Sequence, residues 1–217
     1  MNYFAHSRHY LDDPYFVAGT AVPDWLSVVN RRARARSKLA APYATDQDPR
    51  VAAVARGIMQ HHYDDAWFHQ TRAFAELSLY FTNEIRDRLP KDDGFRPSFL
   101  GHILVELLLD ATLIEDSPVV LDRYYAVMDS LDPYFVNQAV NRMATQETGM
   151  LSFFIPRFSQ ERFLYDYAED AKLLFRLNNV MRRVRLPSLP KALAQFFPEA
   201  RHLVRQRSAE LLAGEAT

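Results

Sequence analysis

The pattern of apolar and polar positions predicts a chain built from helices. Between residues 49 and 81 apolar side chains recur at helical spacing, after the start signal Asp48-Pro49. This spacing predicts one long helix with a break between residues 63 and 72. Residues 98–114 are apolar almost throughout, which predicts a helix buried on most of its sides.

Serine and proline mark the starts of further helices. Helices are expected over residues 118–131, 133–150 and 159–186, and a final helical pair interrupted at Pro198 is expected within residues 190–212. Residues 152–158 are aromatic and contain Pro156, so we expect a loop there. Residues 1–30 mix aromatic side chains with turn signals such as Ala18-Gly19-Thr20, which predicts short helical pieces and turns.

No long linker, repeat or low-complexity segment divides the chain. Its 217 residues are 48% hydrophobic and 24% charged, which is enough to bury a sizeable core. Only 6 glycines are present, so the tight turns of a many-stranded barrel or sandwich are missing. The sequence therefore predicts a single all-α domain spanning residues 1–217.

Charge and cysteine content exclude several classes of function. The 26 Lys and Arg balance 27 Asp and Glu, so nothing attracts the whole chain to nucleic acid or an anionic membrane. With 0 cysteines, any metal ligands must be His, Asp or Glu. The most apolar stretch is shorter than the roughly 20 residues of a membrane span, so we expect none. Residues 1–10 lack the apolar core of a signal peptide, so the cytoplasm is the expected location.

Two neighbouring predicted helices each carry ionisable residues at every fourth position. The two trios are His61, Asp65 and His69, then His102, Glu106 and Asp110. Successive members differ by about 40° around the helix, so each trio shares one face. In the second helix the neighbours are apolar, and an isolated buried carboxylate costs several kcal/mol. Imidazole and carboxylate together suit Mn, Fe, Mg or Zn, so the first two members of each trio are the expected ligands of a divalent ion.

Simpler roles stay open for the residues around these inner pairs. His69 would also be explained as a capping group or as the partner of a carboxylate, and Asp110 as a helix-end carboxylate, with neither touching an ion. His62 and Asp64 fall off the shared face, so we expect them to be solvated or to support the ligands from outside.

Short motifs spread over most of the chain resemble the acyl carrier protein phosphodiesterase family. They are Asn2-Tyr3-Phe4-Ala5-His6, the stretch from Ala18 to Trp25, Ala55-Arg56-Gly57-Ile58 before His61-x-x-x-Asp65, Gly101-His102-Ile103-Leu104, and Arg157 to Arg183. That family looks like a distant relative of the HD-type metal phosphohydrolases. The resemblance implies an HD-like core of about seven helices and hydrolysis of a phosphodiester. It also implies a partner, holo acyl carrier protein, whose phosphopantetheine linkage would be cleaved.

The resemblance also implies which residues line the metal site. Carried over one by one, they are His6, Asp24, His61, Asp65 and His102. One position departs from the family pattern, because Gly101 stands where the family has Asp before the His. Glu106 lies one turn further on the same face and is the expected replacement. Without a replacement, the activity would differ or be lost.

These expectations assign a role to each candidate residue. The expected metal ligands are His6, Asp24, His61, Asp65, His102 and Glu106, and catalytic roles fall to Asp24, Asp65 and His69. A bound divalent ion would lower the pKa of a coordinated water and polarise a phosphoryl oxygen, and a nearby acid would protonate the leaving group. The candidate substrate-binding residues are Arg31, Arg32, Arg34 and Arg36, because Arg binds phosphate and carboxylate bidentately. A solvated loop is the alternative for this basic run.

A second class of function stays open. The His and carboxylate stripes would serve equally as buried ion pairs in a non-catalytic helical binding protein, and Gly101 favours this alternative. Nucleic-acid binding is not expected, because the charges balance and no helix-turn-helix or stacking motif is recognisable.

Overall fold

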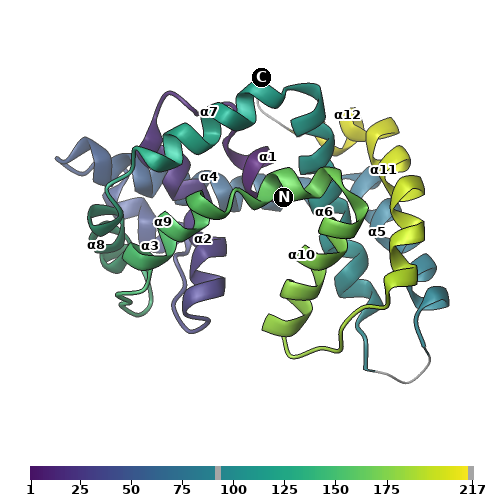
Figure 1. Cartoon of the computed structure of the whole chain (residues 1–217). Coiled ribbons are helices and arrows are strands. Elements are labelled where there is room, and N and C mark those ends of the chain that lie inside the picture. The colour runs from purple at the N-terminus through teal and green to yellow at the C-terminus, as the bar shows by residue number, and fades with distance from the viewer. Residues whose placement is uncertain (91–93, 215–217) are drawn as a thin grey trace. The chain divides into compact units, whose positions relative to one another are not determined.

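The computed structural model describes residues 1–90 and 94–214. In these two ranges the chain is helical and contains no strand (Figure 1). One isolated β-bridge pairs Ala35 with Ala144. The predicted all-α class is therefore confirmed.

The chain folds into two compact units, each assembled from segments that are distant in sequence. We call residues 3–66 and 117–162 the His6 unit, and residues 1–2, 67–116 and those from 163 onward the Glu106 unit. The sequence predicts one domain because no linker marks a boundary. One boundary falls between Ala66 and Trp67, inside a continuous helix, where no composition signal arises.

The His6 unit is organised around a long second helix. Its elements are α1 (Tyr3–Ser7), α2 (Pro14–Val29), α3 (Ser37–Ala40), η1 (Ala41–Tyr43), α4 (Pro49–Phe68, as far as Ala66), α7 (Pro118–Asp129), α8 (Pro133–Met143) and α9 (Leu151–Glu161). Asp13 caps α2 by accepting a hydrogen bond from the Phe16 amide. Helices α7, α8 and α9 pack against α2, and the buried ring of Trp25 meets Phe158 edge-on at 5.4 Å.

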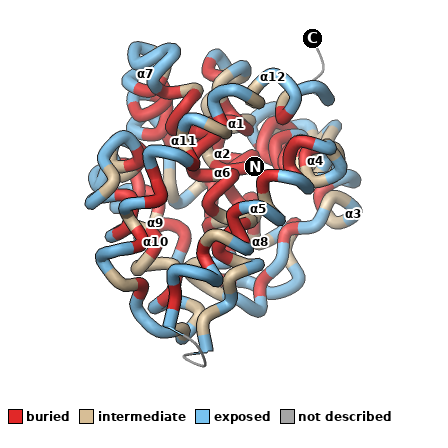
Figure 2. Tube along the Cα trace, turned by 90° about the vertical axis from the view of Figure 1, so that its right-hand side faces the viewer, coloured by how far each residue is buried: buried red, intermediate tan, exposed pale blue. Residues whose placement is uncertain are grey.

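The Glu106 unit is built on a pair of long helices. Its elements are α5 (Arg72–Arg88), α6 (Pro97–Asp116), η2 (Phe163–Ala168), α10 (Asp170–Arg183), η3 (Lys191–Phe196), α11 (Phe197–Gln206) and α12 (Ser208–Leu211). Thr71 caps α5, α5 and α6 pack along each other, and α11 lies against α6. Phe81 and Phe196 meet edge-on at 5.4 Å in the core. Figure 2 marks the buried positions in red.

The apolar helix predicted over residues 98–114 is confirmed as α6. It is long and apolar enough to cross a membrane, but 61% of its most apolar window is buried inside the protein. A helix that is mostly buried belongs to the core, so we identify no membrane span among the described residues. The predicted break in the preceding long helix is confirmed between Phe68 and Arg72, where α4 ends and α5 begins.

Within residues 1–30, the turn expected at Ala18-Gly19-Thr20 is wrong, because α2 runs through it. Gly19 lies inside α2 and serves close packing against α4 rather than a turn. Pro23 also lies inside α2, where it removes one backbone hydrogen bond. The buried side chains of Val22 and Trp25 on either side of it favour the helix.

The loop expected over residues 152–158 and the long helix over 159–186 are also wrong. Residues 151–161 form α9, in which Leu151, Ile155 and Phe158 are buried on one face while Pro156 is exposed. Arg162 then ends α9 in a left-handed conformation (φ 43°), so the following residues start anew as η2 and α10. The chain has more helices than the seven or so that the resemblance implies, and the HD-like arrangement stays a prediction.

Candidate metal centre

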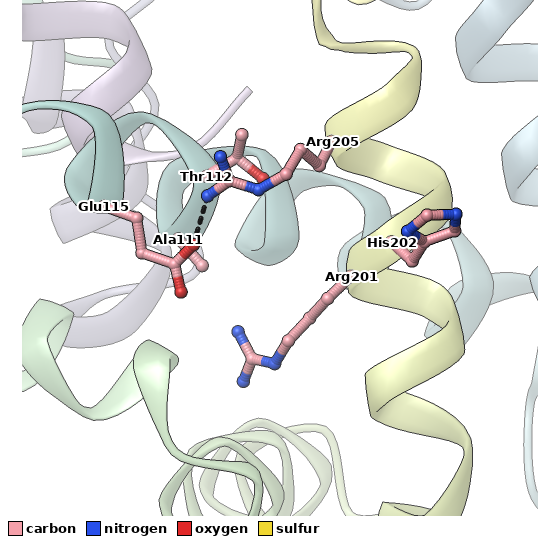
Figure 3. Close-up of a pocket in the computed structure, with 6 residues that line it drawn as sticks. All are labelled: Ala111, Thr112, Glu115, Arg201, His202 and Arg205. Carbon is pink, nitrogen blue, oxygen red and sulfur yellow. Dashed lines mark hydrogen bonds and ion pairs between the residues drawn. The ribbon is translucent and has the colours of Figure 1, made fainter.

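A cavity of about 220 Å³ lies in the Glu106 unit (Figure 3). Its lining residues come from α6 and α11 and are Ala111, Thr112, Glu115, Arg201, His202 and Arg205. Carboxylates already pair with its cations, since Arg205 bonds to Glu115 and Asp116 and Arg201 bonds to Asp170 at 2.9 Å. The cavity contains none of the predicted ligands, so the candidate chemistry lies elsewhere.

In the His6 unit, α2 and α4 approach closest at Gly19 and Gly57. A Cβ at Gly19 would lie 2.3 Å from the carbonyl oxygen of Val54, which no side chain can tolerate, and Gly57 is equally enclosed. One turn beyond Gly57, this close crossing brings His61 against the backbone of Thr20, the residue after Gly19. The two glycines therefore position the first candidate ligand.

The backbone contact of His61 decides which of its nitrogens carries the proton. Nδ1 lies 2.8 Å from the carbonyl oxygen of Thr20, which can only accept, so we assign the proton to Nδ1. Burial, and then the neighbouring His6, lower the pKa of His61 well below its ordinary value. His61 is therefore neutral and presents the lone pair of Nε2, which lies 3.4 Å from Oδ2 of Asp65.

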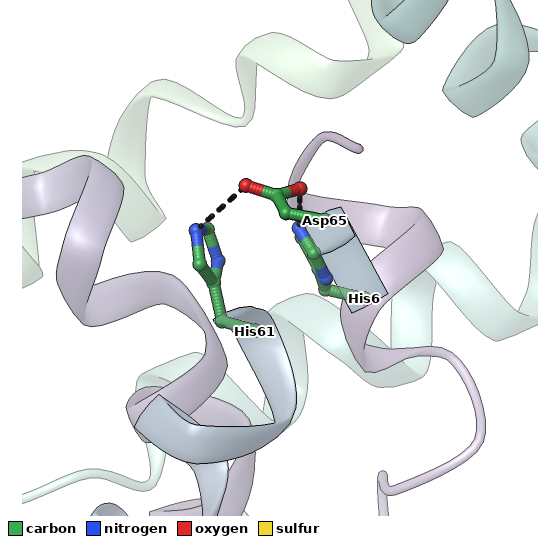
Figure 4. A group of neighbouring side chains, drawn as sticks. All are labelled: His6, His61 and Asp65. Atoms are coloured by element: carbon green, nitrogen blue, oxygen red, sulfur yellow. Dashed lines mark ion pairs between the residues drawn. The ribbon is translucent and has the colours of Figure 1, made fainter. Parts of the chain in front are cut away.

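His6 of α1 is buried beside His61, with the two rings stacked at 4.3 Å between centroids (Figure 4). Its Nδ1 lies 3.0 Å from Oδ2 of Asp64. Its Nε2 faces Oδ1 of Asp65 at 3.4 Å but finds no hydrogen-bond partner in the described part of the chain. Burial opposes the charged form of His6, yet the contacts with the two carboxylates outweigh burial and raise its pKa.

Asp65 of α4 completes this group, which we call the His6 cluster (His6, His61 and Asp65). Burial opposes ionisation of Asp65, but the close imidazole of His6 outweighs it and holds the pKa of Asp65 well below its ordinary value. The side chain of Asp65 is 31% exposed, whereas that of His6 is 1% exposed. The cluster is therefore anionic on its solvent side and closed on the other.

The residues of the His6 cluster fit a divalent cation. Nε2 of His61 and Oδ2 of Asp65 are both hydrogen-bond acceptors, so no hydrogen atom relieves their 3.4 Å approach. Ligands at about 2.1 Å from a tetrahedral ion are about 3.4 Å from one another. One ligand atom from each residue lies within 4.8 Å of the others, and Nε2 of His6 is a buried atom that lacks a partner among the described residues. A cation between these atoms would satisfy all three.

A second group, the Glu106 cluster, consists of His69, His102 and Glu106 in the other unit. Nε2 of His69 and Nε2 of His102 lie 2.9 Å and 3.1 Å from the same oxygen, Oε1 of Glu106. The amino nitrogen of Met1 lies 3.3 Å from that oxygen. Burial opposes ionisation of Glu106, but the amino group and then the two imidazoles outweigh it and hold its pKa well below the ordinary value. Each imidazole can donate to Glu106, so this cluster is satisfied without an ion.

The structure thus divides the expected ligands between two clusters. His61 and Asp65 belong to one cluster, and His102 and Glu106 belong to the other, together with His69. Asp24 belongs to neither; it is half-buried on α2, one turn beyond the Thr20 carbonyl that His61 contacts. Asp110 is fully buried on α6 and is also outside both clusters.

Close packing requires a glycine at position 101, where the family that the motifs resemble has Asp. A Cβ at Gly101 would lie 2.7 Å from the carbonyl oxygen of Ser78 and 2.7 Å from Oγ1 of Thr82, both on α5. An Asp side chain would force α5 and α6 apart. Glu106 does contact His102, as the sequence suggested for a replacement carboxylate.

The candidate substrate-binding arginines lie in residues 31–36 of the His6 unit, a segment that we call the strap. Ala33 and Ala35 are buried, while the arginines around them are exposed. The backbone of Arg34 exchanges hydrogen bonds of 3.0 Å with Thr145, and Nε2 of His62 lies 2.7 Å from the carbonyl oxygen of Ala35. The strap is therefore fixed to α4 at the residue next to His61.

Three arginines of the strap have no carboxylate partner in the structure as described: Arg32, Arg34 and Arg36. Many arginines elsewhere do pair with a carboxylate, as Arg50 does with Asp48 and Arg142 with Asp46. Exposed cations on a fixed backbone are available to an anion from outside the chain.

His62 and Asp64 take the supporting role, which the sequence left open beside a solvated one. His62 anchors the strap, and Asp64 is buried and bonded to His6, although both lie off the face of α4 that carries His61. No spacing rule marks them, because their partners lie 27 and 58 residues away in the chain. The doubled pairs His61-His62 and Asp64-Asp65 were the only signal available.

Comparison with known proteins adds no relative. No protein-family model, no curated protein and no solved structure matches this chain. The resemblance to acyl carrier protein phosphodiesterases thus rests on its short motifs alone.

Proposed function

We propose that this chain is a metal-dependent phosphoester hydrolase whose divalent ion is held by His6, His61 and Asp65. The observation that carries the proposal is the lone pair of His61 Nε2, fixed by the Thr20 contact and aimed at a carboxylate oxygen 3.4 Å away. Two acceptors held this close repel each other unless a cation lies between them.

The arrangement has the features of a catalytic centre. Three protein ligands leave a coordination position for water or substrate, and the exposed side of Asp65 gives solvent access. A divalent ion bound there would lower the pKa of a coordinated water and polarise a phosphoryl oxygen. Asp24 shares the face of α2 that carries Thr20, so it is our candidate for proton transfer to the leaving group. His69 belongs to the other cluster, so we give it no role in this step.

Two considerations support a phosphoester as the substrate. The strap offers the guanidinium groups of Arg32, Arg34 and Arg36, which have no carboxylate partner among the described residues and whose forked geometry matches phosphate oxygens. His62 fixes the strap beside His61. The motif resemblance implies the same chemistry. Holo acyl carrier protein is one phosphodiester to test, alongside small chromogenic diesters.

Elemental analysis combined with hydrolysis assays tests the proposal. We expect about one transition-metal ion per wild-type chain. His61→Ala and Asp65→Asn should lose the ion together with more than about 100-fold of the hydrolysis rate. His9→Ala changes an exposed histidine outside the cluster and is the matched control. Wild-type protein that holds no ion after incubation with Mn, Fe, Zn and Mg, or full activity in His61→Ala, would overturn the proposal.

The second candidate is a non-catalytic helical binding protein. The Glu106 cluster favours it, because that cluster shows that this chain also builds His and carboxylate groups into plain ion-pair networks. Stoichiometric metal without hydrolysis of any phosphoester would favour this candidate.

A further inference from the structure

We infer that Asp64 is a positioning residue for the ion: it orients His6 from behind, and it is not itself a ligand. This inference rests on the proposed metal site. It concerns a residue that the pattern of ionisable positions placed off the ligand face of α4.

Both oxygens of Asp64 are engaged within the protein. Oδ2 lies 3.0 Å from Nδ1 of His6, and Oδ1 accepts a hydrogen bond of 2.8 Å from Nε2 of Gln60, one turn earlier on α4. Asp64 is only 6% exposed. It therefore has no oxygen turned toward solvent where an incoming ion would need one.

The adjacent carboxylates of α4 hold the His6 ring from two sides. Asp64 contacts Nδ1, and Asp65 faces Nε2 at 3.4 Å. Because a carboxylate accepts, Asp64 keeps the proton on Nδ1 and leaves the lone pair of Nε2 for a cation. Of these two adjacent residues, Asp64 therefore orients the His6 ring and Asp65 binds the ion beside it.

The two histidines of the cluster differ in this respect. His61 is oriented by the neutral carbonyl of Thr20, whereas His6 is oriented by a charged carboxylate. A carboxylate partner makes the imidazole a stronger donor to a metal, and removing such a partner typically weakens metal binding 10- to 100-fold. The loss should appear in affinity and not in the number of ions bound.

Asp64→Asn tests the inference, because it keeps the shape of the side chain and removes its charge. We expect manganese and zinc to bind about 10- to 100-fold more weakly, measured by competition with a chelator, with the wild-type stoichiometry at saturation. Gln60→Ala leaves the charge in place and removes only its hydrogen bond, so a loss of a few-fold is expected. Glu161→Gln, an exposed carboxylate of α9 in the same unit, is the matched control and should bind as wild type does.

A second measurement separates positioning from a merely structural role. Nitrogen chemical shifts of the His6 ring, recorded in the metal-free protein at a pH where the ring is neutral, should report a proton on Nδ1 in the wild type and a mixture of tautomers in Asp64→Asn. Wild-type affinity in Asp64→Asn, loss of the bound ion even at saturation, or an unchanged tautomer would each overturn the inference. A wild-type protein that binds no ion would refute the proposed function, whereas the tautomer measurement decides the role of Asp64 independently.

Discussion

Each of the two clusters combines two histidines with one carboxylate, but the imidazole nitrogens that face the carboxylate differ in whether they can donate a proton. In the Glu106 cluster, two imidazoles point Nε2 at one carboxylate oxygen, at 2.9 Å and 3.1 Å, and both can donate a proton to it. In the His6 cluster, the proton of His61 is committed to a backbone carbonyl, so Nε2 meets its carboxylate as an acceptor at 3.4 Å. The atoms behind the ligands, and not the ligands themselves, decide whether a cation is required.

The clusters also differ in how their ligands are held. A contact on Nδ1 fixes each imidazole of the His6 cluster, from Thr20 for His61 and from Asp64 for His6. Both histidines of the Glu106 cluster are more exposed, since His102 is 41% and His69 32% exposed. Ligand sets that bind a metal tightly need such outer support, so the comparison favours the His6 cluster as the metal site that we propose.

Metal removal should give the largest difference in stability between variants of the two clusters. An ion present at about 1,000 times its dissociation constant stabilises the folded protein by about 4 kcal/mol, or roughly 10 °C in melting temperature for a chain of this size. A chelator should therefore lower the melting temperature of the wild type by about that amount. His61→Ala should melt at the same temperature with and without chelator, whereas His69→Ala should respond as the wild type does. Calorimetry measures the melting temperatures of all three proteins. A chelator effect on His61→Ala as large as that on the wild type would contradict the proposed site.

Helices cross closely at Gly19 in the His6 unit and at Gly101 in the Glu106 unit. Substituting these two glycines should have different effects on metal binding. Gly19→Ala places a Cβ 2.3 Å from a backbone oxygen of α4, and Gly101→Ala places one 2.7 Å from a backbone oxygen of α5. Overpacking should cost about 2 to 3 kcal/mol of unfolding free energy in either variant, measured by denaturant titration.

Only Gly19→Ala should also weaken metal binding, because it separates Thr20 from His61. Gly149→Ala is the control, because an added Cβ at Gly149 would meet no described atom within 4 Å. Equal metal affinities of the Gly19 and Gly101 variants would show that the α2–α4 crossing does not position His61.

The pH dependence of stability should report the Glu106 cluster. The lowered pKa of Glu106 means that its contribution is fully present above the ordinary pKa of about 4.3 and is lost as the pH falls through the lower folded-state value. Glu106→Gln should therefore cost about 2 kcal/mol at pH 7, because the imidazoles and the amino group lose a charged acceptor. The difference from the wild type should shrink below about pH 4.

Denaturant titration at several pH values with chelator present measures this difference. A gap between Glu106→Gln and wild type that is constant from pH 7 to pH 3 would contradict the ion-pair role. Glu161→Gln, which removes an exposed carboxylate, is the control and should change little at any pH.

The smallest expected effect concerns the strap. Replacing Arg34 and Arg36 by Ser should raise the KM for a phosphodiester about fivefold with little change in kcat, because exposed charge contacts contribute up to about 1 kcal/mol. The difference should diminish at high salt, where exposed charges are screened. Arg157→Ser removes an exposed arginine that already pairs with Glu161, so it should leave KM unchanged. A salt-independent KM in the double variant would remove the strap from substrate binding.

The fold could be predicted from the sequence where local signals agreed. Proline starts and helical periodicity gave α6, α7 and the break between α4 and α5. The predictions failed at Gly19 and Pro156, where residues that usually mark turns lie inside helices. Burial of neighbouring apolar side chains against other elements overrode the local preference, and a single sequence does not show which face will be buried.

The candidate site was predictable in residue type but not in grouping. The four-residue spacing placed His61 with Asp65 and His102 with Glu106, and both pairs are in contact. The partner of each pair depends on contacts over long sequence distances, such as His6 with Asp64. Periodicity within one helix holds no information on those contacts.

By itself, the sequence determined that this protein is helical, that any metal site must use His and carboxylate, and which of these residues share a helix face. Only the tertiary structure decided that the candidates form two clusters in two units, and that Thr20 and Asp64 fix the protons of one of them. The physical reason is that helix periodicity is a local property of the chain, whereas the protonation of an imidazole depends on the group that packs behind it.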